Sequence, residues 1–301
     1  MIRATVIVTA RDAEATLPRT LAALADQEGA PSFEVLVADD GSSDGTAAIA
    51  ERAGSRVVQG PANAAVAAAS GALLAFCGAD YRPTARWLAA GAQALAEAEL
   101  VQGRVLPDPR GETGAFASPV SVTEETGLYD AGNLFVSRAT FDRLGGFEAG
   151  QGDALTEDTW LAWRARRAGA RTSFCAEALC HRPAGAREPL EHLEEATRRR
   201  AVPGIVAAVP ELRDTLLHRR LFLTPRTMKF DLALAGFALA AGRRSKLPLL
   251  AAVPYALELR RQAKERGGED WTRVAAIDAA ADLLTAAALL HGSVESRTVV
   301  I

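Results

Sequence analysis

Residues 35–46 place two adjacent carboxylates at the end of a strand, and no other stretch constrains the fold as strongly. The sequence there is Val-Leu-Val-Ala-Asp-Asp-Gly-Ser-Ser-Asp-Gly-Thr, an apolar run followed by turn residues. The run predicts a buried strand that ends at Asp39 and Asp40, and Asp44 or Thr46 then caps a helix to about Ala53. Open α/β sheets build ligand sites at such an edge. Acids before glycines are also common in ordinary turns, so this stretch alone allows either interpretation.

Strands and helices alternate along roughly the first 180 residues. Leucines at 17, 21 and 24 recur at helical spacing between two β-branched runs, which makes the opening a strand–helix–strand unit. We expect strands at residues 5–9, 33–38, 56–58, 73–77, 100–105, 134–136 and 171–174. This alternation predicts an α/β fold with a mostly parallel sheet flanked by helices. Residues 107–127 and 150–156 are expected to be loops, which on such folds usually bind something.

The pattern changes beyond about residue 185. Apolar runs at residues 230–241, 247–257 and 274–290 predict helices, and acids or prolines interrupt each run. None reaches the ~18–20 uninterrupted apolar residues of a spanning helix. Basic residues precede the runs, at positions 198–200, 219, 220, 226 and 229. We therefore expect two domains, 1–185 and 186–301. The second is either a membrane-interfacial helical extension or a helical cap on the first domain or a partner chain.

Composition narrows the class of protein and its compartment. The formal net charge of -3 gives no bulk basic signal for nucleic acid. Cys77, Cys175 and Cys180 form an odd set without metal-ligand spacing, which is typical of reduced thiols in a cytosolic protein. The N-terminus runs straight into a strand, so no signal peptide is expected.

Four motifs in one order resemble the family-2 glycosyltransferases of GT-A fold. They are residues 6–11 with Glu14, residues 37–46, residues 76–83, and residues 156–169 after Gly145-Gly146-Phe147. The resemblance covers about residues 3–183, and the extension looks like that of some bacterial members. It implies a nucleotide-diphosphate sugar donor, a Mn²⁺ or Mg²⁺ cofactor, and a glycan or lipid-linked acceptor in cell-envelope assembly. It also implies a cytoplasmic protein at the inner face of the plasma membrane, with peripheral membrane contact.

The resemblance also assigns roles to individual residues. Thr9 and Arg11 are expected near the nucleotide base, and Asp39 on the base or its ribose. Asp80 matches the last acid of the metal-binding Asp-x-Asp element. His181 matches the position from which some members bring a histidine to the metal or the diphosphate. Asn63 is retained from an element that approaches the nucleotide. Asp158 matches the general base, with Glu157 beside it.

The chemistry agrees with these roles, although each residue also has an ordinary structural explanation. A divalent cation neutralises the charge that grows on a departing diphosphate. A carboxylate accepts the proton of the attacking hydroxyl, and one such displacement inverts the anomeric carbon without a covalent intermediate. Acids at a helix start, such as Glu157 and Asp158, favour the helix dipole anyway. A lone histidine such as His181 is more often structural.

The sequence departs from the family on the donor half. Gly78 stands where the first acid of Asp-x-Asp is usual, and Pro61-Ala62-Asn63 lacks the family's arginine. The leading hypothesis is an inverting, metal-dependent glycosyltransferase. The alternative is a catalytically degenerate GT-A protein that serves as a binding or scaffold subunit. A nucleotidyltransferase is disfavoured because no glycine-rich, lysine-containing phosphate loop follows the first strand.

Overall fold

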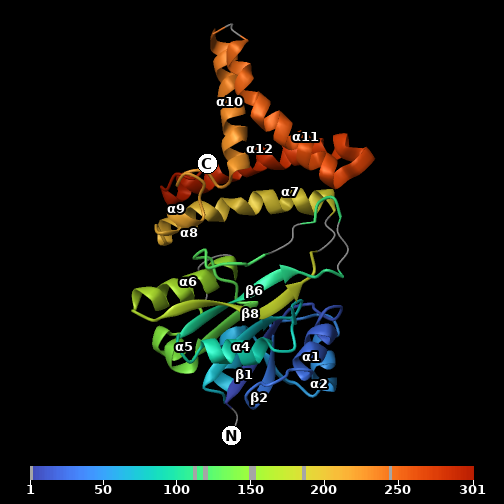
Figure 1. Cartoon of the computed structure of the whole chain (residues 1–301), viewed down its shortest axis with the longest axis vertical. Helices are drawn as coiled ribbons and strands as arrows, with labels where there is room; N and C mark the ends of the chain where they lie inside the picture. Colours follow the sequence, from blue (N-terminus) through green and yellow to red (C-terminus); the bar gives the residue numbers. More distant parts are fainter. Residues whose placement is uncertain (1–2, 111–113, 118–120, 149–153, 185–187, 244–245) are drawn as a thin grey trace. The chain divides into compact units, whose positions relative to one another are not determined.

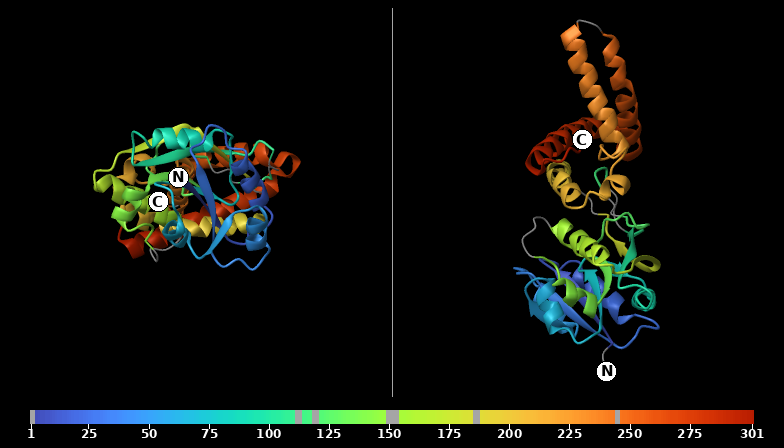
Figure 2. Two further views of the ribbon diagram at one scale, coloured as in Figure 1. Left: turned by 90° about the horizontal axis from the view of Figure 1, so that it is seen from below. Right: turned by 90° about the vertical axis from the view of Figure 1, so that its left-hand side faces the viewer.

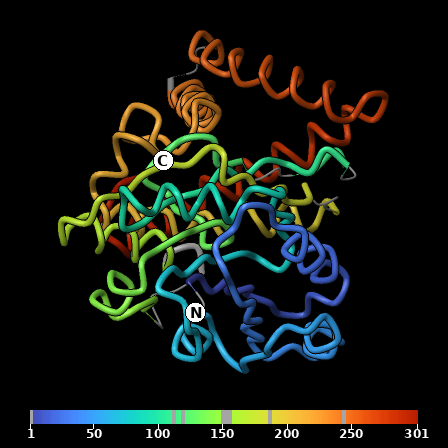
Figure 3. Tube along the Cα trace, turned by 60° about the horizontal axis from the view of Figure 1, so that its bottom comes forward, coloured from blue at the N-terminus to red at the C-terminus, as the bar shows by residue number. Residues whose placement is uncertain are grey.

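The computed structural model describes residues 3–110, 114–117, 121–148, 154–184, 188–243 and 246–301. The chain forms two compact units, one of residues 1–111 and 119–184, the other of residues 112–118 and 185–301. Figure 1 labels many of their helices and strands, and the Cα trace in Figure 3 follows the chain from β1 in blue to α12 in red. Each unit has its own hydrophobic core, and each is described by itself below.

The first unit is built on an eight-stranded sheet of order β3-β2-β1-β4-β7-β6-β8-β5. The strands are β1 (Ala4–Ala10), β2 (Phe33–Asp39), β3 (Arg56–Gln59), β4 (Leu73–Gly78), β5 (Arg82–Pro83), β6 (Leu100–Pro107), β7 (Asn133–Ser137) and β8 (Thr172–Arg182). The helices are α1 (Leu17–Ala25), α2 (Thr46–Arg52), α3 (Ala62–Ala68), α4 (Trp87–Ala94), α5 (Arg138–Leu144) and α6 (Ala154–Arg167).

The sheet is mixed but mostly parallel, as the sequence predicts, since four of its seven strand pairs are parallel. Strands β1 to β4 are parallel to one another, as expected. Strand β7 runs antiparallel to both β4 and β6, and β5 runs antiparallel to β8. Antiparallel neighbours need no crossover helix, so alternation along the sequence does not reveal them. The α/β class and the flanking helices are confirmed.

Two helical layers cover the two faces of the sheet because side chains alternate along each strand. Val6 and Val8 of β1 pack into one core with helices α1, α2 and α4. Ile7, between them, packs into the other core with α3, α5 and α6. The Leu17, Leu21 and Leu24 stripe of α1 is buried, as its spacing predicts. The parallel strands are therefore covered on both faces, which leaves their ends as the accessible part of the sheet.

Strand β8 is longer than its sequence predicts and reaches the edge of the sheet where β1 and β4 end. The expected strand covered only residues 171–174, but β8 continues to Arg182. A bulge interrupts its pairing with β6 at Gly103/Arg104, and parallel pairing then resumes at Leu179. A bulge is invisible to a period-two pattern because it shifts which side chains share a face.

The second unit is helical. Its elements are α7 (Pro189–Arg198), η1 (Arg199–Ala201), α8 (Val202–Ala208), α9 (Leu212–Thr215), α10 (Pro225–Arg243), η2 (Leu247–Ala252), α11 (Val253–Gly267), η3 (Gly268–Asp270) and α12 (Trp271–Ser296). Helices α10 and α11 form a hairpin, drawn in orange in Figure 2. Gly236 of α10 allows close packing against η2, which joins the two helices, because a Cβ there would lie 2.4 Å from the Pro248 carbonyl oxygen.

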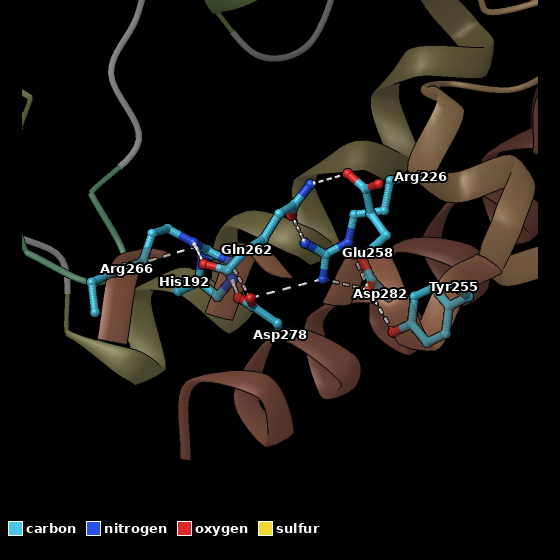
Figure 4. Close-up of polar contacts among 9 residues, drawn as sticks. His192, Arg226, Tyr255, Glu258, Gln262, Arg266, Asp278 and Asp282 are labelled. Carbon is cyan, nitrogen blue, oxygen red and sulfur yellow. Dashed lines mark hydrogen bonds and ion pairs between the residues drawn. The ribbon is translucent and has the colours of Figure 1, made fainter. Parts of the chain in front are cut away.

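A buried polar network joins four helices of this unit (Figure 4). Asp278 of α12 is only 1% exposed and pairs with His192 of α7 and with Arg266 of α11. Arg226 of α10 donates to Asp282 at 2.7 Å, and Asp282 also accepts from the Tyr255 hydroxyl at 2.7 Å. The acids and prolines that interrupt the apolar runs thus include the residues that hold the helices together.

Candidate active site

The candidate site lies at the edge of the sheet where the parallel strands β1, β2 and β4 end. Their register places Ala10 beside Asp39 and Thr9 beside Gly78. A cavity of about 520 Å³ opens at this edge. Its lining comes from the ends of β1, β4 and β8, from the loop after β1, from the segment before β7 and from α6. The lining residues are Thr9, Arg11, Asp12, Ala13, Thr16, Gly78–Tyr81, Asp130–Gly132, Asp158 and Arg182. A second cavity of about 320 Å³ shares Thr9, Arg11, Ala131 and Asp158 with it.

The loop after β1 is tied to the loop after β2. The Asp12 carboxylate accepts a hydrogen bond from the Ser43 backbone at 2.7 Å, and Glu14 accepts one from the Gly45 backbone at 2.8 Å. Asp12 itself has a φ of 46°, a left-handed conformation that aspartate tolerates better than most residues. Thr9 and Arg11, at the start of the first loop, line both cavities. The predicted contact of these two residues with a nucleotide base stays a prediction.

Asp39 and Asp40 have different surroundings. Asp39 is 2% exposed, and its carboxylate accepts hydrogen bonds from the Ser42 backbone at 3.0 Å and from Gln59 at 3.1 Å. Burial raises its pKa, but the bonds from Ser42 and Gln59 outweigh burial and leave the pKa below its ordinary value. Asp40 is exposed and lines the smaller cavity. Asp39 therefore stabilises the turn, and the assignment of Asp39 to the base or ribose stays a prediction.

Gly78, which stands in place of an acid, is required by the packing of Tyr81. A Cβ at Gly78 would lie 2.4 Å from Cδ2 of the Tyr81 ring. That ring is 3% exposed, and its hydroxyl donates to Asp130 at 2.6 Å. Burial and the Asp130 charge raise the pKa of Tyr81 well above its ordinary value, so the hydroxyl stays protonated. The missing carboxylate is thus replaced by a buried aromatic side chain.

Asp80 is paired with an arginine. The Nε–H of Arg182 donates to the Asp80 carboxylate at 2.8 Å, and the guanidinium lies 5.1 Å from the centroid of the Tyr81 ring. The side chains of Arg182 and Asp80 are 35% and 38% exposed, so solvent screens their attraction and the pair contributes little to stability. Both residues line the larger cavity, so the pair is placed to contact a ligand bound there.

His181 is the neighbour of Arg182 on β8, and successive side chains of a strand point to opposite faces. Its Nδ1 lies 3.3 Å from the Pro107 carbonyl oxygen. Within the described residues that line the larger cavity, Arg182 is present and His181 is not. The structure therefore brings Arg182, and not His181, to Asp80.

The described residues do not fit a protein-held metal ion. Across the described ranges, no group of three or more His, Cys, Asp or Glu side chains could hold one. Hard divalent cations use at least one or two carboxylates even when a substrate supplies the other oxygens. The carboxylate that matches the family pattern, Asp80, is paired with the Arg182 guanidinium. The position of the other usual carboxylate is occupied by Gly78.

Asp158 is a buried carboxylate on the wall of both cavities. It is 7% exposed, and its oxygens accept hydrogen bonds from the Ala131 backbone at 2.9 Å and the Thr159 backbone at 2.7 Å. Burial raises its pKa to about 8, with a further contribution from the Asp130 charge, although the backbone donors oppose the rise. Glu157 lines the smaller cavity. Helix α6 begins at Ala154, earlier than expected, and the rest of the predicted 150–156 loop lies outside the described residues.

Asn63 has a structural partner. Its side-chain amide donates to the Phe147 carbonyl at 2.6 Å, and its oxygen accepts from the Phe147 backbone N–H at 3.0 Å. Asn63 therefore holds the segment after Gly145-Gly146, and Phe147 lines the smaller cavity. Its predicted contact with the nucleotide stays a prediction.

Three polar residues of the larger cavity are not predicted from the sequence, namely Tyr81, Asp130 and Arg182. Asp130 is positioned by Gln102, whose side-chain oxygen accepts from the Asp130 backbone at 2.8 Å. The buried side chain of Asn133 accepts a hydrogen bond from the Trp87 indole and donates to two backbone carbonyls. The only local signal for this loop is the turn-forming composition of Asp130-Ala131-Gly132-Asn133.

Comparisons with known proteins bear on the family and on the fold. A sequence model described as glycosyl transferase family 2 matches residues 5–155, half of the chain. A mannosyltransferase from Pyrobaculum calidifontis, solved with GDP-Man and Mn²⁺, has a TM-score of 0.64 at 20% identity, with 94% of this chain and 87% of that chain covered. S. aureus TarS residues 1–349 with UDP-GlcNAc gives 0.50 at 17% identity, covering 99% and 93%. Glucosyl-3-phosphoglycerate synthase from Mycobacterium tuberculosis, with phosphoglyceric acid, gives 0.50 at 18%, covering 69% and 80%. No curated protein matches the chain.

Proposed function

Because the chain belongs to glycosyl transferase family 2, we propose that it transfers a sugar from a nucleotide-diphosphate sugar to an acceptor hydroxyl with inversion. The observation that carries the proposal is Asp158, a buried carboxylate with a raised pKa on the wall of the cavity. A base of this pKa accepts a proton more readily than an ordinary aspartate does. Solved structures of similar fold contain GDP-Man or UDP-GlcNAc, which supports a nucleotide-sugar donor.

The reaction needs one displacement. The acceptor oxygen forms a bond to the anomeric carbon while the bond from that carbon to the diphosphate oxygen breaks. The acceptor proton passes to the Asp158 carboxylate, and the bonding electron pair leaves with the nucleoside diphosphate. The backbone N–H groups of Ala131 and Thr159 hold the Asp158 carboxylate in place. No covalent nucleophile is required, and a single displacement inverts the anomeric carbon.

The experiment is a ligand screen followed by an activity assay on the purified full chain. A nucleotide sugar present at about 100 times its Kd should stabilise the protein by roughly 2.7 kcal/mol, which a thermal shift detects. Release of nucleoside diphosphate on addition of candidate acceptors then measures transfer. If ligands stabilise the protein but no acceptor gives turnover, the degenerate binding-subunit alternative is favoured. If no nucleotide or nucleotide sugar binds, the proposed function is wrong.

Dependence on a divalent metal ion is a separate question from sugar transfer. Mn²⁺ is present in two of the similar folds, the mannosyltransferase and a complex of the phosphoglycerate synthase. This chain fits such an ion poorly, because Asp80 is paired with Arg182 and position 78 is glycine. The proposed displacement uses no step through a metal. Dependence of turnover on Mn²⁺ or Mg²⁺ is tested by repeating the assay with a chelator.

We also propose that the acceptor is a polysaccharide or glycolipid of the cell envelope and that the second unit contacts the membrane. Large apolar side chains are exposed along the α10–α11 hairpin, namely Leu232, Leu234, Phe237, Leu239, Leu247, Leu250, Val253 and Leu257. Within the described residues, Leu247–Ser296 is long and apolar enough to cross a membrane, with 22% of its most apolar window buried. A helix in the core of a soluble protein meets the same criteria of length and composition. Shallow insertion uses the exposed face alone.

Flotation with anionic vesicles tests the membrane proposal. Changing Leu232, Phe237 and Leu250 together to Gln should release the full chain from the vesicles, since each change removes exposed apolar surface. Leu190→Gln is the matched control, because Leu190 is comparably exposed but lies on α7. Equal flotation of the triple variant and the control, or no flotation of the wild type, would leave the helical cap or partner-chain alternative.

A further inference from the structure

We infer that Arg182 takes the place of the divalent cation and binds the diphosphate of the donor directly. The inference rests on the proposed function, because it concerns the same cavity and the same donor. It begins from a disagreement between the family pattern and this chain. The pattern requires acids that hold a cation, whereas this chain pairs its one matching acid, Asp80, with a guanidinium.

The position of Arg182 follows from the strand that carries it. Strand β8 resumes its parallel pairing with β6 after the bulge, and this extension ends at Arg182. The guanidinium therefore reaches the cavity edge formed by Gly78–Tyr81. The Tyr81 ring below it and the Asp80 carboxylate beside it fix its plane. A guanidinium held in this way loses little conformational freedom when it binds an anion.

The chemistry of Arg182 suits a diphosphate. The contact with Asp80 uses the Nε–H, and a guanidinium carries four further N–H donors. Its fork geometry matches the oxygens of a phosphate, and charge-assisted bonds of this kind are among the strongest in proteins. Asp80 then serves to orient the guanidinium. It is a positioning residue, whereas the cation pattern would make it a metal ligand.

Few other groups of the larger cavity carry the positive charge that binding a diphosphate needs. Among the described residues that line the larger cavity, Arg11 and Arg182 are the basic ones. Arg11 also lines the smaller cavity, at the loop where the base is expected. The remaining charged residues of the lining are acids, which repel a diphosphate. Arg182 is therefore the cation placed at the end of β4, where the family pattern puts the metal.

Calorimetric titration of UDP and GDP into the full chain tests the inference, with EDTA in one arm and Mn²⁺ in the other. Wild type should bind one of the two equally well in both arms. Arg182→Ala should weaken that binding about 10- to 100-fold, and Arg182→Lys should recover part of it. Arg82→Ala is the matched control, because Arg82 pairs with Asp108 at 2.9 Å and is comparably exposed but does not line the described cavity.

Asp80→Asn separates the two interpretations of this site. Under the inference, Asp80→Asn leaves binding in EDTA within a few-fold of wild type, since the guanidinium still carries the charge. If Asp80 holds a cation, binding requires Mn²⁺ and Asp80→Asn removes it. Binding that survives Arg182→Ala, or that is lost in EDTA, overturns the inference alone. No binding of either nucleotide by the wild type overturns the inference and the proposed function together.

Discussion

The hydroxyl of Tyr81 donates a hydrogen bond to the Oδ2 of Asp130 at 2.6 Å, which joins the end of β4 to the segment before β7. The Tyr81 ring fills the space that a side chain at Gly78 would need. Gly132 has the same neighbour, since a Cβ there would lie 2.4 Å from Cζ of Tyr81. The aromatic ring therefore specifies glycine at two positions on the cavity floor.

Restoring the family's acid at position 78 should damage the protein. By the family pattern alone, an acid at position 78 would add a metal ligand and tighten metal-dependent donor binding. The structure reverses that expectation, because the new Cβ would collide with a buried ring. We predict that Gly78→Ala and Gly78→Asp each lower the free energy of unfolding by about 1–3 kcal/mol. Denaturant unfolding measures this. A Gly78→Asp variant as stable as wild type that also gains Mn²⁺-dependent donor binding would contradict the prediction.

Transfer should depend on the ionisation of Asp158. Since its pKa is about 8, the fraction of carboxylate rises with pH up to that value. We expect kcat/KM to increase from about pH 6 to about pH 8 and then to level, because kcat/KM reports groups of the free enzyme. Initial rates of nucleoside diphosphate release across this range provide the measurement. A profile that is flat over the same range would remove Asp158 from the role of base.

Asp158→Asn should abolish transfer while donor binding persists. An amide cannot accept the acceptor's proton, and loss of a general base costs about 10²–10⁴-fold in rate. The neighbouring Glu157→Gln is the control, and it should cost less because Glu157 is on the wall of the smaller cavity alone. Turnover and calorimetric donor binding are compared for both variants. Wild-type turnover in Asp158→Asn would refute the assignment.

The same substitution should change how stability depends on pH. A folded-state pKa raised from 3.8 to about 8 means that the folded protein holds a proton that the unfolded chain releases. Stability from Asp158 is therefore full below about pH 4 and is lost as pH rises to about 8. The amide in the Asp158→Asn variant does not titrate, so the stability of this variant relative to wild type should rise from about pH 5 to about pH 8.5. Thermal unfolding at both pH values measures this difference, and an unchanged difference would count against the raised pKa.

The buried network of the helical unit should matter more than its surface ion pairs (Figure 4). Burial raises the pKa of Asp278, but the bond from His192 and the Arg266 charge outweigh burial and lower it overall. Asp278→Asn should cost about 3 kcal/mol, because it leaves basic groups without their buried partner. Glu295→Gln, which breaks an exposed pair with Arg200, should cost less than about 1 kcal/mol. Denaturant unfolding of both variants gives the two costs.

The pH dependence of this unit has the opposite sign to that of Asp158. The stability contributed by ionised Asp278 is present above its unfolded pKa of about 3.8 and is lost as pH falls through the lower folded value. Acid unfolding of Asp278→Asn should therefore be shallower than that of wild type. Equal costs for Asp278→Asn and Glu295→Gln would show that the network carries no special weight.

The sequence alone predicts several strands, the buried face of α1 and the acids at the strand ends, because short-range residue patterns determine these features. The continuous apolar runs predict the strands β1, β2 and β4, because a strand buried on both faces needs such a run. The leucine stripe of α1 predicts its buried face for the same kind of reason. The acids at strand ends, Asp39 and Asp80, are found at the sheet edge because parallel strands end together there. Order along the chain also carried the family resemblance, which the sequence comparison confirms.

The hydrogen-bond partners of the residues in the candidate site lie in distant segments of the chain. Arg182 and Asp80 are 102 residues apart, and Tyr81 and Asp130 are 49 apart. Whether His181 or Arg182 meets Asp80 depends on the register of β8 after its bulge, since a shift of one residue exchanges the two faces of a strand. The raised pKa of Asp158 likewise arises from burial and from the charge of Asp130, 28 residues earlier in the chain. Residue type alone leaves these properties open, because desolvation and strand register exist only once the chain has packed.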